Sequence, residues 1–154
     1  MFIIFTKKLM PQIRNLLEDK GFYRIPLKKL KSGHYKFSAK INSISGNFIL
    51  DTGASTSCIG FKSISYFSLK SEESSIKAAG AGAINMKTKL ARNNNIAIGL
   101  WSITKIDFVL FDLSHVNEAL LQAEEEPVHG IIGADFLKRT RAVIDYGRNC
   151  LYVK

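Results

Sequence analysis

The sequence contains few cysteines, histidines and prolines, and these shortages exclude several classes of protein. Its two cysteines, Cys58 and Cys150, cannot form a disulfide framework or a spaced metal cluster, so we expect both to be reduced core residues. The histidines, His34, His115 and His129, lack metal-ligand spacing, and we expect each to pack on the surface or in the core. No metal or other cofactor is therefore predicted.

Long apolar runs are also missing. No stretch approaches the length that a membrane-spanning helix needs. The opening residues MFIIF are too few for the apolar core of a signal peptide, and the lysines follow them instead of preceding them. We therefore expect no membrane partner and a cytoplasmic protein.

Acidic residues are scarce relative to basic ones: 13 Asp and Glu stand against 22 Lys and Arg, for a formal net charge of +9. A basic field attracts polyanions, so a basic β domain that binds nucleic acid is one alternative. The basic residues are scattered, however, and short runs such as KKLK and KRTR are typical of a solvated face. The strands also lack the interleaved aromatic and basic side chains of single-strand binding, so nucleic acid is the less favoured partner.

Length and apolar periodicity predict one mostly β domain with minor helices. The 154 residues, 46% of them hydrophobic, suffice for one core and are too few for two ordinary domains. Residues 10–21 predict a short amphipathic helix that starts at Pro11 and stops at Gly21. Strands are expected over residues 22–31 and 34–42, then, after a turn at Ser43–Gly46, in an apolar run that ends at Asp51.

Further elements follow downstream of Asp51. Residues 78–85 (AAGAGAIN), between strand-like SSIK and MKTKLA, predict the tip of a hairpin, and residues 94–111 predict two strands about a GLW corner. A helix is expected after Ser114 as its N-cap. The segment VHGIIGADFLKR predicts a strand, a glycine and a short helix whose start Asp135 stabilises, and the chain closes with a hairpin in which Asp145 occupies a turn or pairs with an arginine.

The most informative stretch is FILDTGASTSCIG, in which an apolar strand runs directly into Asp51. An unpaired carboxylate at the edge of apolar surroundings is costly, so either a turn or a reaction must require it. Alone, DTG is an ordinary turn signal, because Asp caps the backbone and Gly tolerates positive φ. Ser55, Thr56 and Ser57 have no assigned base beside them, so we expect them to hydrogen bond to the loop or its carboxylate.

Three motifs in a fixed order resemble those of the retropepsin-like aspartic proteases, small bacterial ones above all. They are DTGA after an apolar strand, a glycine-bearing hairpin, and HGIIGADFL followed by AVIDYGRNCLYV. The resemblance runs from about Phe22 to the C-terminus, which implies an N-terminal helical extension over residues 1–21 and a protease domain over residues 22–154. It also implies an acid-protease β-barrel with minor helices and one lobe per chain.

The same resemblance implies which residues form the site. The catalytic motif would be Asp51, Thr52 and Gly53. The flap over the substrate would be Ala79, Gly80, Ala81 and Gly82. The supporting residues of the loop would be Ala54, Ser55, Ile131, Ile132 and Gly133.

A single DTG per chain has a consequence for assembly. Peptide hydrolysis by carboxylates needs one ionised acid to activate water and one protonated acid to polarise the carbonyl. The second acid must therefore be Asp51 of another copy, across a two-fold axis. The implied function is a homodimeric aspartic endopeptidase that acts on peptides or proteins, with residues 149–153 at or near the interface. An alternative keeps the fold without catalysis, as a peptide-binding or dimerisation module.

Overall fold

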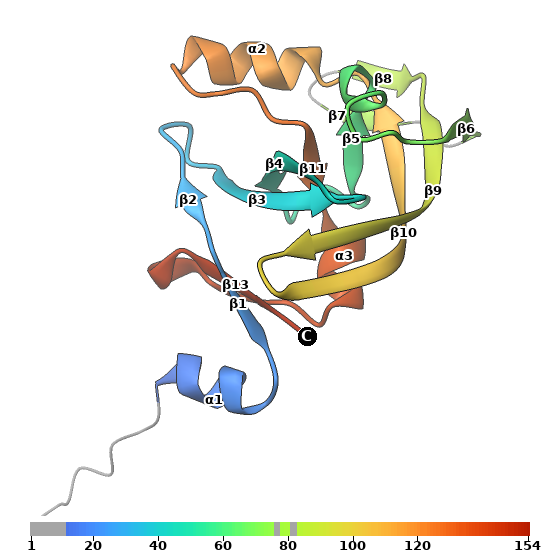
Figure 1. Cartoon of the computed structure of the whole chain (residues 1–154). Coiled ribbons are helices and arrows are strands. Elements are labelled where there is room, and N and C mark those ends of the chain that lie inside the picture. The colour runs from blue at the N-terminus through green and yellow to red at the C-terminus, as the bar shows by residue number, and fades with distance from the viewer. Residues whose placement is uncertain (1–11, 76–77, 81–82) are drawn as a thin grey trace, which may run out of the picture.

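The computed structural model describes residues 12–75, 78–80 and 83–154, and strands dominate this part of the chain (Figure 1). The helices are α1 (Ile13–Asp19), α2 (Ser114–Gln122) and α3 (Ala134–Arg139), with 3-10 turns at Phe61–Ser63 and Tyr146–Arg148. The mostly β fold expected from the sequence is confirmed. Among the described residues, no helix combines the length and apolar character that crossing a bilayer requires.

Six strands close into a mixed barrel. In sheet order they are β3 (Tyr35–Ile41), β4 (Ile44–Leu50), β11 (Gly130–Ile132), β5 (Cys58–Gly60), β10 (Trp101–Phe111) and β9 (Lys89–Ile98). The barrel closes because β9 also pairs with β3, Ile41 lying opposite Ile96. The pairs β4–β11 and β5–β10 are parallel, and the other pairs are antiparallel. Two short strands, β2 (Lys28–Lys29) and β6 (Ser71–Glu73), extend this sheet.

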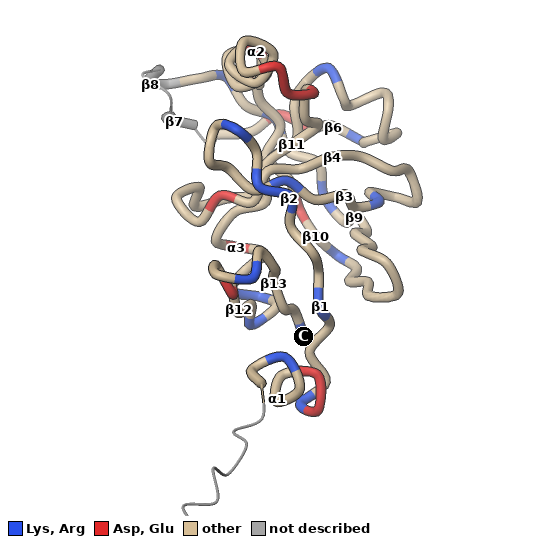
Figure 2. The backbone as a smooth tube through the Cα atoms, turned by 90° about the vertical axis from the view of Figure 1, so that its left-hand side faces the viewer, with Lys and Arg blue, Asp and Glu red and all other residues tan. Residues whose placement is uncertain are grey.

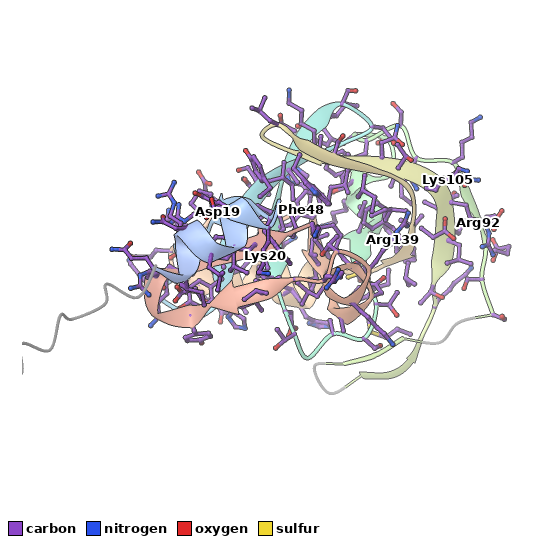
Figure 3. The ribbon with its side chains drawn as sticks, turned by 90° about the horizontal axis from the view of Figure 1, so that it is seen from below. Asp19, Lys20, Phe48, Arg92, Lys105 and Arg139 are labelled. Carbon is purple, nitrogen blue, oxygen red and sulfur yellow. The ribbon has the colours of Figure 1, made fainter. Side chains whose placement is uncertain are left out.

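The barrel interior is apolar because alternate residues of each strand point inward. In β3 the predicted inward residues Tyr35, Phe37, Ala39 and Ile41 are all buried. Phe48 of β4, labelled in Figure 3, is fully buried and lies against the rings of Phe37 and Phe67, with centroids 6.4 and 6.1 Å away. Burial of this kind supplies the main favourable free energy of folding.

A second apolar layer forms where α2 covers the outer face of the barrel. Its buried members are Leu30, Ile49, Leu120 and Val128. Ion pairs border it, with Lys31 Nζ 2.8 Å from Glu124 and Lys36 Nζ 3.3 Å from Glu126. These contacts join the turn before β3, and β3 itself, to the loop after α2.

A three-stranded sheet made from the two ends of the described chain lies below the barrel (Figures 1 and 2). Its order is β1 (Tyr23–Pro26), β13 (Cys150–Val153) and β12 (Val143–Asp145), all antiparallel. One face contributes to the barrel core through Ile25, Leu151 and Val153. The other face is covered by α1, whose Leu17 packs with Cys150 and Tyr152.

Four local predictions need correction. The expected strand over residues 22–31 is divided, because β1 joins the lower sheet and only β2 pairs with β3. The turn expected at Ser43–Gly46 lies at Asn42 and Ser43, both with positive φ, and Gly46 lies inside β4. A side chain there would reach 2.5 Å from the ring of Phe67, so this glycine serves close packing.

The other two corrections concern the hairpin and α2. In the segment SSIK, Ser74 and Ser75 are not in a strand, and residues 76–77 lie outside the described residues, as does Pro11. Ser114 is the first residue of α2 instead of its N-cap. The side chain of Asp112 does the capping, accepting hydrogen bonds from Ser114 N at 2.9 Å and Ser114 Oγ at 2.6 Å.

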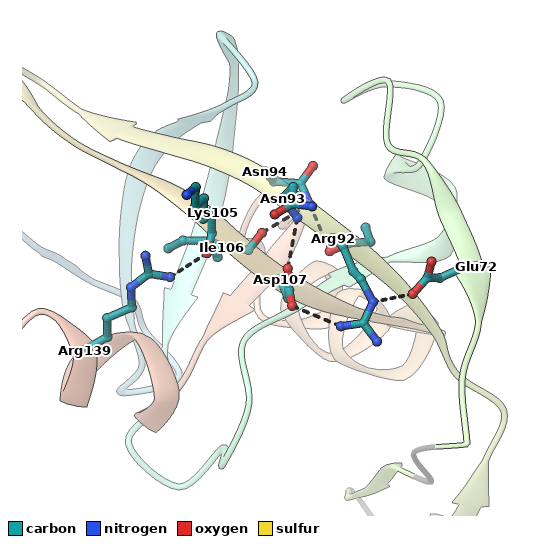
Figure 4. Close-up of polar contacts among 9 residues, drawn as sticks. Glu72, Arg92, Asn93, Asn94, Lys105, Ile106, Asp107 and Arg139 are labelled. Atoms are coloured by element: carbon teal, nitrogen blue, oxygen red, sulfur yellow. Dashed lines mark hydrogen bonds and ion pairs between the residues drawn. The ribbon is translucent and has the colours of Figure 1, made fainter.

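The long β9–β10 hairpin turns at Gly99, as predicted, and is irregular further along (Figure 4). Asn93 and Lys105 have positive φ where the register shifts. Asp107 accepts a hydrogen bond from Asn93 N at 2.9 Å, and the guanidinium of Arg139 donates to the carbonyl of Lys105 at 2.6 Å. Arg139 thereby ties α3 to the irregular part of β10.

Candidate active site

Asp51 lies immediately after β4, where the strand runs parallel to β11. The ladder continues into the loop, because Asp51 N donates to the carbonyl of Ile132 at 3.0 Å. The loop then turns tightly: Asp51 Oδ1 accepts the N–H of Gly53 at 2.8 Å, and Ala54 N donates to the carbonyl of Asp51 at 3.2 Å. One carboxylate oxygen is therefore held by the loop itself. Within the described residues, Asp51 Oδ2 makes no hydrogen bond.

The far side of the loop is braced by the junction of β11 and α3. Ala134 N donates to the carbonyl of Ala54 at 2.8 Å. Gly133 is buried, and a Cβ there would lie 2.6 Å from the carbonyl oxygen of Ala54 and 3.0 Å from the carbonyl carbon of Thr56. The loop approaches this junction so closely that only glycine fits. The expected supporting residues Ile132 and Gly133 thus lie directly against the loop, and Ala54 is the loop residue that Gly133 approaches.

Ser57 and Asp135 form a second brace, which the sequence did not reveal. Asp135 Oδ1 accepts hydrogen bonds from Ser57 N at 2.8 Å and from Ser57 Oγ at 2.6 Å. Ser57 Oγ in turn accepts the N–H of Gly133 at 3.0 Å. Asp135 also lies in the first turn of α3, so its predicted position at a helix start is confirmed. Its carboxylate therefore holds the end of the Asp51 loop through these hydrogen bonds.

Cys58 lies next to Ser57 at the start of β5 and is buried. The pKa of its thiol is raised to about 12, chiefly by burial; a hydrogen bond with the backbone of Ile131 lowers it in part, and the nearby charges of Asp135 and Asp51 add to the rise. The thiol is therefore neutral at physiological pH and does not act as a nucleophile. Cys58 and Cys150 are both free and buried, as expected.

The outer side of the loop is open to solvent. Thr52, Gly53, Ser55 and Thr56 are exposed, and Asp51 is half-buried. The hydroxyl of Thr52 makes no hydrogen bond within the part of the chain that the structure describes. Ser55 contributes no side-chain contact to the brace, unlike Ser57 two residues later. The loop therefore presents a carboxylate oxygen and a hydroxyl that one chain leaves unused.

The glycine-bearing segment forms a hairpin, as the sequence predicted. Its strands are β7 (Ala78–Gly80) and β8 (Ala83–Met86), with Ala78 opposite Met86 and Gly80 opposite Ala83. Figure 1 shows these strands at the upper end of the molecule, away from the three-stranded sheet of β1, β13 and β12. Ala79 and Gly80 lie on β7, and Ala81 and Gly82 lie outside the described residues.

The remaining candidates have packing roles. His129 stacks on Tyr66, with centroids 5.0 Å apart, and its Nδ1 accepts the N–H of Asn47 at 3.0 Å. Burial lowers the pKa of His129. Trp101 meets Phe136 edge-on and packs, partly buried, against the core. The described residues contain no group of three His, Cys, Asp or Glu side chains suited to a metal ion.

Comparison with known families agrees with this geometry. A family model described as aspartyl protease matches residues 37–136, well over half of the chain, and includes the Asp51 loop and the junction of β11 with α3. The chain belongs to the aspartyl protease family. No curated protein matches its sequence. The boundary between a helical extension and a protease domain at residues 21 and 22 stays a prediction.

Three solved structures of the retropepsin-like fold are similar to this aspartyl protease family member. A retropepsin-like aspartic protease from Rickettsia conorii has a TM-score of 0.57 at 20% identity, covering 86% of this chain and 90% of that one. EIAV protease in complex with the inhibitor HBY-793 has a TM-score of 0.53 at 22% identity, covering 71% and 89%. The retroviral protease-like domain of Ddi1 from Leishmania major has a TM-score of 0.52 at 18% identity, covering 84% and 88%. At these identities the likeness establishes the shared fold, and the expected retropepsin-like fold is confirmed.

Proposed function

We propose that the chain is an aspartic endopeptidase whose water nucleophile is activated by two Asp51 carboxyls, one from each chain of a homodimer. The observation that carries this proposal is the Asp51 loop of an aspartyl protease family member. Asp51 Oδ1 is held by Gly53 N at 2.8 Å, and Oδ2 has no hydrogen bond among the described residues. The loop thus holds an oriented carboxyl with one oxygen available for a second carboxyl and a water.

The chemistry needs two such carboxyls. Held within about 3 Å of each other, they share one proton, because both cannot ionise together. The ionised carboxyl takes a proton from water as its oxygen attacks the carbonyl carbon, and the protonated carboxyl donates to the carbonyl oxygen. The tetrahedral intermediate collapses when the C–N bond breaks: the leaving nitrogen takes the proton that the first carboxyl received from water, and a hydroxyl of the intermediate returns its proton to the second carboxyl. The pair titrates as one unit.

The exposed part of the loop supports pairing across a two-fold axis. Thr52 is exposed and its hydroxyl has no hydrogen bond within the described residues, so it is free to bond to the partner's loop. Gly53 has no side chain, which lets two backbones approach closely. We assign these residues, with Asp51, to the catalytic motif.

The substrate is a peptide segment of a polypeptide, and the β7–β8 hairpin is its flap. The hairpin lies at the end of the molecule opposite the three-stranded sheet (Figure 1), and α3 carries the brace of the Asp51 loop. Ala79, Gly80, Ala81 and Gly82 would cover the bound peptide, chiefly through their backbone. The two free, buried cysteines support a cytoplasmic location.

The substitution Asp51→Asn tests this proposal. We expect it to abolish cleavage of a mixed peptide library across the pH range while unfolding behaviour stays the same, because an amide fits the turn and cannot activate water. Glu118→Gln, on exposed α2, removes an equal charge and serves as the control. Equal cleavage by the Asp51→Asn variant and the unaltered protein would contradict the proposal. Peptide binding without cleavage by either would favour the inactive peptide-binding module.

A further inference from the structure

The C-terminal strand β13, which the resemblance places at or near a dimer interface, has no free edge. Leu151 lies opposite Ile25 of β1 on one side and opposite Ile144 of β12 on the other. A second chain therefore cannot add its backbone to β13. If the lower sheet continues into a partner, it continues through the outer edge of β1 or of β12.

The outer edge of β1 is interrupted by a proline. Leu27 N donates to the carbonyl of Asn149 at 2.8 Å, and in an antiparallel ladder alternate residues face the same partner. Ile25 therefore also faces β13, whereas Arg24 and Pro26 direct their backbone groups outward. Pro26 has no N–H to donate, and proline on an edge strand opposes pairing with another chain.

The outer edge of β12 has no such interruption. By the same alternation Leu151 faces β1, so Cys150 and Tyr152 face β12, where their partners are Asp145 and Val143. Ile144, between them, directs its N–H and carbonyl away from the sheet. Among the described strands, none pairs with β12 on that side.

The β12 edge also lies on the correct side of the molecule for the proposed chemistry. In Figure 2, β12 is on the same side as α3, and β1 lies on the opposite side of β13. The Asp51 loop is bound to the start of α3 through Ala54 and Ala134. A partner that approaches β12 therefore also approaches the open face of the Asp51 loop.

Helix α1 adds an apolar surface beside this edge. Leu17 packs against Val143 of β12, and Ile13 lies one turn earlier on the same helical face. Figure 2 shows that α1 begins below the β12 side and ends below β1. Ile13 and Leu16 are nevertheless 42% and 45% exposed. The preceding segment, which includes MFIIF, joins the chain at this same end of the helix.

We propose that the outer edge of β12 and the first turn of α1 form the dimerisation surface, occupied by a second copy of this chain. The two β12 strands pair antiparallel about the two-fold axis, and the two Ile144 residues exchange their N–H and carbonyl groups. The lower sheet then becomes continuous, with three strands from each chain. Ile13 and Leu16 pack on the partner. This inference rests on the proposed function, because the second Asp51 must come from that copy.

Two variants test the surface by sedimentation velocity over a dilution series, in an Asp51→Asn background so that assembly is measured without activity. Ile144→Pro removes the outward N–H, and the double variant Ile13→Glu, Leu16→Glu places charge on the apolar turn. We expect each to raise the dimer dissociation constant at least tenfold. Leu100→Glu, at the 96% exposed tip of the β9–β10 hairpin, is the matched control and should leave it unchanged.

The outcomes separate this inference from the proposed function. The helical double variant changes only exposed residues, so it stays informative even if Ile144→Pro unfolds the lower sheet. If the double variant dimerises at the same concentration as the parent, the proposed dimerisation surface is wrong, and the paired-Asp51 proposal stands. If the parent protein remains monomeric at every concentration, the proposed dimerisation surface is also wrong. A strict monomer with Asp51 that cleaves peptides at full rate overturns both.

Discussion

Gly133 offers a sharp test of how the active-site loop is held. Its φ of −109° and ψ of −167° are open to any residue, so alanine there causes no backbone strain. The added Cβ, however, would lie 2.6 Å from the carbonyl oxygen of Ala54 and 3.1 Å from that of Thr56. Both neighbours are main-chain atoms of the Asp51 loop. The substitution Gly133→Ala therefore moves the loop itself.

The magnitude follows from these distances. Carbon and carbonyl oxygen approach to about 3.3 Å, so the loop must move by about 0.7 Å near Ala54. Overpacking a well-filled site costs about 1–3 kcal/mol, so we expect the free energy of unfolding to fall by about 2 kcal/mol. A displacement of about 1 Å in a catalytic group costs about 100-fold in rate. We expect kcat/KM to fall by roughly 10- to 100-fold.

Two measurements are combined. Circular dichroism monitors unfolding in urea, and peptide cleavage is measured at a protein concentration high enough for all chains to be dimeric. Gly147→Ala is the control, because its Cβ would meet nothing closer than Asp145 Oδ1 at 3.8 Å. The control should match the unaltered protein in both measurements. If Gly133→Ala also matched it in both, the close approach would have no part in positioning Asp51, and the reasoning would be wrong.

Three further predictions concern Ser57 and Cys58, at the end of the loop. Ser57→Ala should lower the free energy of unfolding by about 1–3 kcal/mol, because it leaves Asp135 and the N–H of Gly133 short of partners; an unchanged urea midpoint would contradict this. Cys58 should react with iodoacetamide at pH 8 about 1,000-fold more slowly in the native protein than after unfolding, because burial raises its pKa from 9.0 to about 12. Mass spectrometry measures the extent of alkylation, and rapid alkylation of the native protein would refute this prediction. The same shift makes the protein less stable as pH rises from about 9 to 12, because the unfolded thiol ionises first. This slope should become shallower in Cys58→Val, and the part that remains comes from Tyr35 and Tyr152, whose pKa values are also raised by burial.

Local signals predicted most elements because they depend on neighbouring residues. The alternation from Tyr35 to Ile41 and the apolar run before Asp51 predicted β3 and β4. The glycine-bearing segment was correctly predicted to form a hairpin, although its strands lie within residues 78–86 and not in the flanking SSIK. Gly46 misled because glycine usually marks turns, whereas here it makes room for Phe67. The single strand expected over residues 22–31 failed for a different reason. Its first half pairs with residues 124–130 positions away and its second half with residues 6–8 positions away, and no local pattern reveals the distant pairing.

In the candidate site, too, contacts between neighbouring residues were predicted from the sequence and contacts between distant residues were not. Asp51 and Gly53 are neighbours, and their turn was predicted from the DTG sequence. The brace between Ser57 and Asp135 joins residues 78 apart, and each was assigned a separate structural role from the sequence. The only available signal was chemical: a serine after the DTG motif and a carboxylate after the GIIG segment each needed a partner. The edge position of β12 likewise required the pairing of three distant strands.

The way the loop is held bears on how assembly and catalysis depend on each other. Asp51 is anchored to Ile132, Ala54 to Ala134, and Ser57 to Asp135, all within one chain. A loop that is ordered before association loses little conformational entropy when the partner binds, so association is governed by the surface that the chains bury. In the proposed dimer that surface is β12 and α1. Dimer affinity should therefore respond to Ile13 and be nearly independent of the carboxyl of Asp51, whereas peptide cleavage requires both.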